Sequence, residues 1–162
     1  MNKSIFIIMG VSGTGKTTIG KLLSKTYGFP FFDGDDFHPS ANIEKMASGR
    51  PLDDNDREGW LKSLNKLAQE HIKSGAIIAC SALKEIYRET LSEGITNKIV
   101  FVFLKGSFEQ VKSRLDNRKG HFMSSALLKS QFDTLEEPKD AIEASIQLSP
   151  EEIITTIQNQ LK

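Results

Sequence analysis

The sequence has little of what marks several large classes of proteins. A single cysteine among 162 residues excludes an internal disulfide framework, and its place in the apolar run AIIAC predicts a buried, inert thiol at Cys80. No apolar run approaches the length of a membrane span, and the stretch before Gly10 is too short for a signal peptide. Neither sign of charge dominates, since 21 basic residues balance 21 acidic ones, so the net charge does not favour nucleic acid or an anionic membrane.

The chain also lacks internal repeats, low-complexity segments and any proline- or serine-rich stretch that would act as a linker. Its length is enough to bury one hydrophobic core. We therefore predict a cytoplasmic protein with a single domain over residues 1–162 and with no nucleic-acid or membrane partner.

Short apolar runs alternate with longer amphipathic stretches along the chain. The near-continuous runs IFIIM and IVFVFL are typical of strands that helices cover on both faces. This alternation predicts a parallel sheet in a three-layer α/β fold, whose ligands bind beyond the carboxyl ends of the strands. The expected strands are Ile5–Met9, Phe29–Phe32, Ala76–Cys80, Ile99–Leu104 and, more weakly, Ala141–Ile146.

The segment GVSGTGKT, residues 10–17, follows the first expected strand and opens a helical pattern. It matches the phosphate-binding pattern GxxxxGK[ST] through Gly10, Gly15, Lys16 and Thr17. Glycines let backbone amides curl around phosphate oxygens, the lysine reaches the β- and γ-phosphates, and the threonine hydroxyl ligates Mg²⁺. A glycine-rich turn with a chance lysine is the alternative. The strand, the spacing and the helix favour a bound nucleotide, but they do not identify the acceptor of its phosphate.

A cluster of carboxylates follows the second expected strand, in the segment FFDGDDFHP. Transfer of a phosphoryl group to an alcohol needs one carboxylate to orient the hydroxyl and accept its proton, and others beside the magnesium ion. We expect Asp33 and Asp35 to serve in these roles and to share one side of an extended segment. A solvated Asp/Gly turn is the alternative. His38 either contacts a substrate or braces the loop, and the phenylalanines of the segment are expected in the core.

A long polar insertion, residues 38–60, includes the start of a helix expected near Asp56. Long ordered insertions at this edge of a sheet usually bind a ligand or act as lids. The insertion contains Arg50, and Asp54 or Asn55 is expected to cap the helix.

The third expected strand ends in Cys-Ser where motor and transport ATPases carry an aspartate, which argues against that class. Lys84 and Arg88 follow at helical spacing and could hold an acidic group of a substrate, or form a solvated pair. After the fourth expected strand, the basic segment SRLDNRKGHF holds Arg114, Arg118 and His121. These side chains could close over the transferring phosphate, or they could simply end a helix with basic residues.

Taken in order, GVSGTGKT, DGDDFHP, NIEKMASGRPLDDNDREGWL, CSALKEIYR and RKGHFM resemble the gluconate kinase (gluconokinase) family, in the shikimate-kinase-like branch of the P-loop kinases. The resemblance extends over roughly residues 5–138, and residues 42–60 are far more specific than the phosphate loop. It implies a five-stranded parallel sheet, a mobile lid near residues 117–130 and a homodimer. It also implies phosphorylation of D-gluconate at the 6-hydroxyl, with ATP and Mg²⁺ as cofactors.

The resemblance implies roles for individual residues as well. Lys16, Asp35 and Arg118 are the expected catalytic residues, and Thr17 and Asp33 are the expected metal ligands. The nucleotide is expected to bind Gly10, Ser12, Gly13, Thr14, Gly15, Lys16, Thr17, Thr18, Arg114 and Arg118. The sugar acid is expected to bind Asp35, His38, Arg50, Lys84, Arg88 and His121.

Two alternatives stay open. The same fold could phosphorylate another acceptor, such as shikimate, a different sugar acid or a nucleoside. A nucleotide-dependent switch without a small-molecule acceptor is a function of another class. The polar insertion and the missing aspartate at the end of the third strand argue against the switch.

Overall fold

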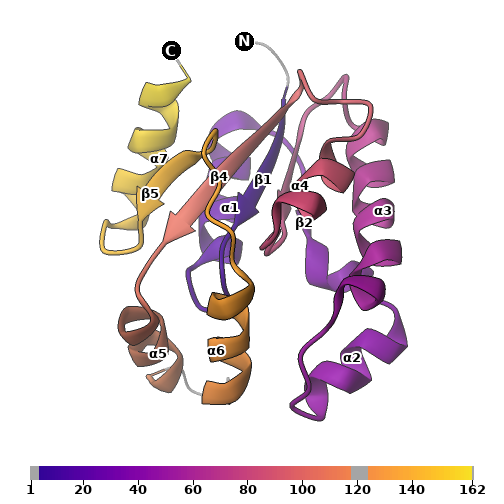
Figure 1. Cartoon of the computed structure of the whole chain (residues 1–162). Helices are drawn as coiled ribbons and strands as arrows, with labels where there is room; N and C mark the ends of the chain where they lie inside the picture. Colours follow the sequence, from indigo (N-terminus) through magenta and orange to yellow (C-terminus); the bar gives the residue numbers. More distant parts are fainter. Residues whose placement is uncertain (1–3, 118–123, 162) are drawn as a thin grey trace.

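Five parallel strands form the centre of the computed structural model, which describes residues 4–117 and 124–161 (Figure 1). The order across the sheet is β2-β3-β1-β4-β5, and Ile7 of β1 lies opposite Ile78 of β3 and Phe101 of β4. The predicted three-layer α/β fold with a five-stranded parallel sheet is confirmed. The strands are Ile5–Met9 (β1), Phe31–Asp33 (β2), Ala76–Ala79 (β3), Ile99–Lys105 (β4) and Ile142–Ser145 (β5).

The strand order determines which face of the sheet each helix covers. Because crossovers between parallel strands are right-handed, a chain that moves outward from β1 to β2 and then back to β3 places the two connections on opposite faces. Accordingly, α1 (Lys16–Tyr27) packs beside α7 (Pro150–Gln160), and α3 (Asp54–Glu70) packs beside α4 (Glu85–Ser92). Figure 1 shows α4 in front of the sheet and α1 behind it.

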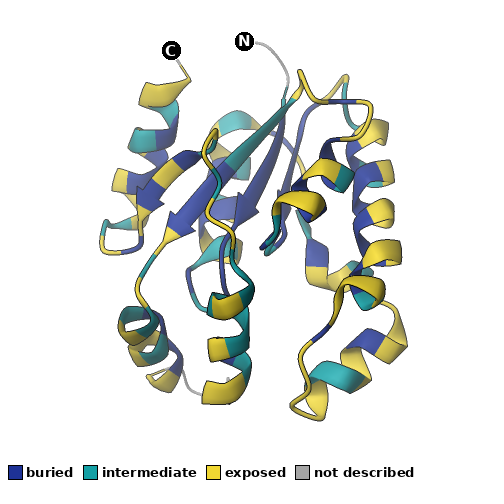
Figure 2. Ribbon diagram, in the orientation of Figure 1, coloured by how far each residue is buried: buried dark blue, intermediate teal, exposed yellow. Residues whose placement is uncertain are grey.

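The core lies mainly between the sheet and these four helices. Every residue of β1 and β3 is buried, because both faces of the central strands are covered. The helices bury one stripe each, as α3 does with Trp60, Leu61, Leu64 and Ala68. Figure 2 shows this division, with dark blue central strands and yellow outer turns on the helices.

Helix α3 is capped by a different residue from those expected. Asp53, rather than Asp54 or Asn55, is the N-cap: its carboxylate accepts from the Asp56 amide at 2.8 Å, and the Asp56 carboxylate accepts from the Asp53 amide at 2.9 Å. This capping box satisfies amides that the start of a helix leaves unpaired. Asp54 pairs instead with Lys84, at 2.9 Å.

Three further helices lie beyond the carboxyl ends of the strands, below the arrowheads in Figure 1. They are α2 (Ser40–Ala47), which forms inside the polar insertion, α5 (Phe108–Asp116) and α6 (Ser125–Thr134). Helix α6 includes the last part of the expected lid, while residues 118–123 of that lid lie outside the described residues. In the described part of the chain, no helix has the length and apolarity needed to cross a membrane.

Candidate active site

The loop between β1 and α1 requires glycine at particular positions. Gly13 has a φ of 84°, and a Cβ there would lie 2.9 Å from Leu115 Cγ. Gly15, which caps α1, has a φ of 94°. Both values lie in the left-handed region that side chains disfavour. The loop is therefore held in a curled form that presents its amides and the N-terminus of α1 to an anion, with Thr17 and Thr18 exposed on the first helical turn.

Lys16 is folded back onto this loop. Its Nζ donates to the backbone carbonyls of Gly10 and Val11, each at 3.0 Å, and the Thr14 hydroxyl donates to Val11 at 2.8 Å. Burial lowers the pKa of the Lys16 ammonium, and the Asp35 carboxylate partly opposes this shift. The Lys16 ammonium is therefore held within the loop, beside the carboxylates that follow β2.

Helix α6 is hydrogen-bonded to the same loop through Gln131. The backbone N–H of Ser12 donates to the Gln131 side-chain oxygen at 2.7 Å, and the Gln131 amide nitrogen donates to the Ser12 hydroxyl at 3.0 Å. The Ser12 amide, which was expected to contact the nucleotide, is thus paired with α6. The helix that follows residues 118–123 contacts the phosphate loop directly.

The carboxylates after β2 point into two different pockets. Asp33 ends β2 and caps the 3₁₀ helix Gly34–Phe37 (η1), accepting from the Asp35 amide at 3.0 Å. Asp33 lines one pocket together with Thr17, while Asp35 lines another together with Lys16. The expectation that the two aspartates share one side was wrong, because the chain turns into η1 there and does not stay extended.

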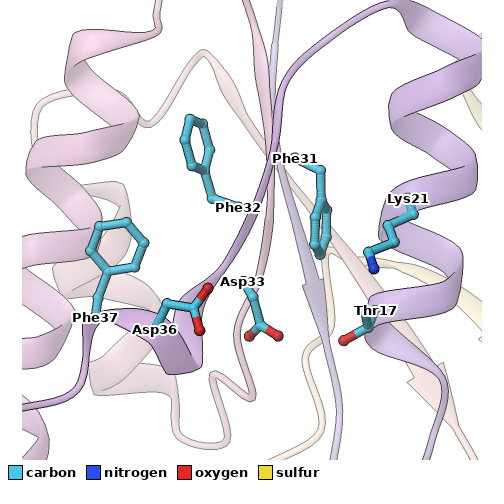
Figure 3. A pocket seen from close by; sticks show the side chains of 7 residues that line it. All are labelled: Thr17, Lys21, Phe31, Phe32, Asp33, Asp36 and Phe37. Carbon is cyan, nitrogen blue, oxygen red and sulfur yellow. The ribbon is translucent and has the colours of Figure 1, made fainter.

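The pocket that holds Asp33 has a volume of about 410 Å³ and lies beside the edge strand β2. Figure 3 shows the Thr17 hydroxyl and the Asp33 carboxylate pointing into the same space. Phe31, Phe32 and Phe37 form its apolar walls and are only partly buried against the core, so the expectation that they belong to the core is met in part.

Thr17 and Asp33 offer oxygen ligands of the kind that Mg²⁺ takes. Among the described residues, no group of three or more His, Cys, Asp or Glu side chains could hold a metal ion. In phosphoryl-transfer sites Mg²⁺ binds one or two protein oxygens and completes its shell with water and substrate phosphates. The two residues therefore fit a nucleotide-bound Mg²⁺ and do not form a metal cage by themselves.

A second pocket, of about 430 Å³, opens on the phosphate loop and is bounded by α2, α3 and α6; we call it the acceptor pocket. Its lining combines a few charged and polar groups with apolar side chains, as in small-molecule sites generally. It is formed by Ser12, Lys16, Asp35, His38, Met46, Ala47, Gly49, Pro51, Leu52, Arg57, Trp60, Ser81, Leu83, Ser124, Leu127, Ser130 and Gln131.

Asp35 brings a carboxylate into the acceptor pocket near Lys16. Although 81% of its side-chain surface is exposed, loss of hydration raises the pKa of the carboxyl, and the charge of Asp33 adds to this effect. The Lys16 ammonium lowers the same pKa. The carboxylate is therefore accessible to a ligand and more basic than an isolated aspartate, which suits a proton acceptor.

His38 both braces and lines the acceptor pocket. Its ring stacks on Trp60 with centroids 3.9 Å apart and planes at 19°, and the Trp60 N–H donates to the Gly34 carbonyl at 2.7 Å. The His38 side chain is 3% exposed. Burial, together with the charge of Arg57, lowers the pKa of the imidazole to about 4, so the ring is neutral near pH 7.

Arg57 is a site residue that the sequence reasoning missed. Its side chain is buried in α3, lines the acceptor pocket, donates to the Tyr87 hydroxyl at 2.9 Å and lies 5.2 Å from the centre of that ring. None of the ion pairs between described residues includes it. A signal was present, since Arg57 precedes the buried Trp60 by three residues and Leu61 by four, which places it on the buried face of α3.

Three of the basic residues expected at the sugar acid lie elsewhere. Arg50 is exposed and its Nε donates to the Ser48 hydroxyl at 2.9 Å. Lys84 is the N-cap of α4 and pairs with Asp54, whereas Arg88 turns inward. The Arg88 guanidinium donates to the backbone carbonyls of residues 82 and 136, at 2.7 and 2.8 Å. None of the three lines the acceptor pocket, and Lys84 and Arg88 do not act as a pair.

Arg114 lies beside the phosphate loop. Its guanidinium is 3.9 Å from the position of a Cβ on Gly15, and it donates to the Ile146 carbonyl after β5. This contact connects α5 to the loop that precedes α7. Arg118 and His121, expected at the phosphate and the sugar acid, lie outside the described residues.

Comparison with known proteins agrees with this geometry. The family model of shikimate kinase matches residues 12–162. Among curated proteins, the thermoresistant gluconokinase of Escherichia coli is 47% identical over 83% of this chain and 77% of its own, and a probable gluconokinase of Xenopus tropicalis is 42% identical over 98% and 91%. A gluconokinase structure from Sinorhizobium meliloti has a TM-score of 0.91 with 36% identity, covering 99% of this chain and 92% of that one.

The phosphate loop, the parallel sheet and the shikimate kinase match define a P-loop kinase of the shikimate-kinase-like class. Within that class, the identities over most of both chains are decisive. The chain belongs to the gluconokinase family.

Proposed function

We propose that this protein transfers the γ-phosphoryl group of ATP to the 6-hydroxyl of D-gluconate, giving 6-phospho-D-gluconate and ADP. The observation that carries the proposal is the acceptor pocket itself. It joins the phosphate loop at Lys16, and its described lining includes an accessible carboxylate, Asp35, and a buried guanidinium, Arg57. A sugar acid has a carboxylate at one end and a primary hydroxyl at the other. A guanidinium can bind the first and a carboxylate can orient the second, so its site needs both side chains.

Arg57 binds the carboxylate of gluconate in this proposal. A guanidinium matches a carboxylate in shape and can donate two parallel hydrogen bonds. Its support is the burial of Arg57 in the pocket lining and the absence of an ion-pair partner among the described acidic residues. Arg50, Lys84 and Arg88 have no such support, because all three lie outside the lining.

Asp35 orients the 6-hydroxyl and accepts its proton as the oxygen attacks the γ-phosphorus. Its raised pKa and its access to the pocket support this role. Lys16 leaves the loop carbonyls and neutralises charge on the transferring group. Arg114 holds the nucleotide side, and Arg118 and His121 stay predicted as residues that close over the site.

Thr17 and Asp33 would hold Mg²⁺ in the pocket beside β2. When bound, the ion neutralises the β- and γ-phosphates. Asp33 lines this pocket and Asp35 lines the acceptor pocket. In this proposal Asp33 therefore contacts the metal ion, and Asp35 contacts the acceptor hydroxyl.

The proposal is tested by ADP release with Mg-ATP and an acceptor panel of D-gluconate, shikimate, glucose and no acceptor. Strong stimulation by gluconate alone is the expected result, and Lys16→Ala should abolish it. Stimulation by another acceptor, or hydrolysis that no acceptor changes, would contradict the assignment. The homodimer and the cytoplasmic location implied above stay predictions, and sedimentation of the purified protein tests the first.

A further inference from the structure

The side chain of Asn42 has its orientation fixed by the backbone of α3. Asn42 lies on α2, is 4% exposed, and its amide nitrogen contacts the Asp56 carbonyl at 2.8 Å and His38 Nδ1 at 3.1 Å. A backbone carbonyl can only accept, so the group that faces Asp56 must be the NH₂ and not the side-chain oxygen. The Asn42 amide nitrogen therefore donates in both contacts, to the Asp56 carbonyl and to His38 Nδ1.

The second N–H of this amide determines where the His38 ring carries its proton. Because the N–H points at Nδ1, that nitrogen must present a lone pair, and the proton of the neutral imidazole is on Nε2. A proton on Nδ1 would face the hydrogen of the Asn42 amide. Burial of the ring and the positive charge of Arg57 also favour the neutral form over the imidazolium.

The protonated nitrogen lies on the catalytic side of the ring. His38 Nε2 is 3.8 Å from Asp35 Oδ1, and both residues line the acceptor pocket. This distance is too long for a direct hydrogen bond. A hydroxyl group that enters beside Asp35 therefore meets both a carboxylate that accepts and an N–H that donates.

We propose that Asn42 is a positioning residue of the acceptor pocket: it holds His38 in the Nε2–H tautomer, and this N–H binds a hydroxyl oxygen of the phosphate acceptor next to Asp35. The binding of a hydroxyl rests on the function proposed above, whereas the tautomer does not. The other tautomer would offer a lone pair at Nε2, and a lone pair next to the Asp35 carboxylate would leave the hydroxyl oxygen without a donor.

The tautomer is read directly from the long-range ¹H–¹⁵N correlation spectrum of the ¹⁵N-labelled full-length protein near pH 7. His71 is an internal reference of the opposite kind, because its Nδ1 contacts the Leu67 carbonyl at 2.9 Å and must carry the proton. We expect His38, assigned by its loss in His38→Gln, to be protonated at Nε2 only. Protonation of His38 at Nδ1 would overturn the proposal.

Asn42→Asp tests the consequence for catalysis, because a carboxylate at this position accepts from Nδ1–H and leaves Nε2 without its proton. We expect kcat with gluconate to fall by about tenfold, the scale of one hydrogen bond. The KM for ATP should not change, and the rate should depend on pH near neutrality as His38 becomes easier to protonate.

Lys45→Gln is the matched control. Lys45 lies one turn further along α2 and pairs with the Asp56 carboxylate at 2.6 Å, so its loss also loosens α2 from α3 but does not touch His38. We expect the control to keep the wild-type tautomer, kcat and pH profile. Equal effects of the two substitutions, or wild-type kinetics in Asn42→Asp, would contradict the proposal. Asn42 would then only help to pack α2 against α3. If Asn42→Asp does not fold, the wild-type spectrum still decides the tautomer of His38, and it does so even if gluconate proves to be the wrong acceptor.

Discussion

His38 and Trp60 stack face to face with their ring centroids 3.9 Å apart, and both line the acceptor pocket. Trp60 is the only tryptophan in the chain. The pair therefore gives the proposed sugar-acid site its own optical signal.

Gluconate should change the fluorescence of Trp60 without any nucleotide. The indole is 2% exposed and forms part of the pocket wall, so a ligand that fills the pocket alters its surroundings. We expect a saturable change with D-gluconate and none with glucose, which lacks the carboxylate. An equal response to both sugars would place recognition outside the acceptor pocket.

Asp35→Asn should separate catalysis from nucleotide binding. The amide cannot accept the proton of the 6-hydroxyl, so kcat should fall by roughly 10²–10⁴-fold, the usual contribution of a positioned acid or base. ATP affinity, measured by calorimetry, should stay within about two-fold, because the phosphate loop is untouched. Asp116→Asn, which removes an exposed carboxylate paired with Lys112, is the control. Turnover near the wild-type rate in Asp35→Asn would remove Asp35 from the reaction.

Arg57→Gln and Arg50→Gln should behave differently. Loss of a buried guanidinium that binds a carboxylate should raise the KM for gluconate by roughly 10–100-fold, the range for hydrogen bonds to charged groups. Arg50 is exposed and bonded to Ser48, so its loss should change the KM by no more than about two-fold. The melting temperature of Arg57→Gln must be recorded beside the kinetics, because Arg57 also holds Tyr87. A larger rise in the KM for gluconate in Arg50→Gln than in Arg57→Gln would indicate that Arg50, and not Arg57, binds the carboxylate.

The neutral His38 should make the protein less stable in mild acid. Its pKa falls from the ordinary 6.5 to about 4 in the folded state, so the unfolded chain binds more protons between these values. The free energy of unfolding should therefore fall as the pH drops from 6.5 towards 4, by up to about 3 kcal/mol, and should not depend on this group above that range. Urea unfolding of wild type and His38→Gln across this range measures the difference. A parallel loss in both proteins would mean that His38 titrates normally.

The sheet could be predicted from the sequence because its strands carry their own signal. IFIIM and AIIA are buried on both faces and read as continuous apolar runs, and the glycine spacing after β1 has a direct backbone reason in the left-handed φ values of the loop. The resemblance to gluconate kinases identified the family that the comparisons show.

The acceptor side could be predicted less well, because its geometry depends on tertiary contacts. Asp33 and Asp35 were paired by their spacing, yet the turn into η1 directs them into different pockets. Arg88 was expected to hold an acidic group of the substrate, but its guanidinium donates to backbone carbonyls far apart in the chain. Arg57 was overlooked because a charged residue near a helix start is usually solvated, and only its packing in the fold distinguishes it.

The most direct test of the central claim is to identify the product formed from Mg-ATP and D-gluconate, by ³¹P and ¹³C NMR of the reaction mixture. The acceptor pocket, with Asp35 beside the phosphate loop, predicts one phosphomonoester on the C6 oxygen of gluconate, formed in step with ADP. Phosphate on another oxygen, or free phosphate with unchanged gluconate, would contradict the account.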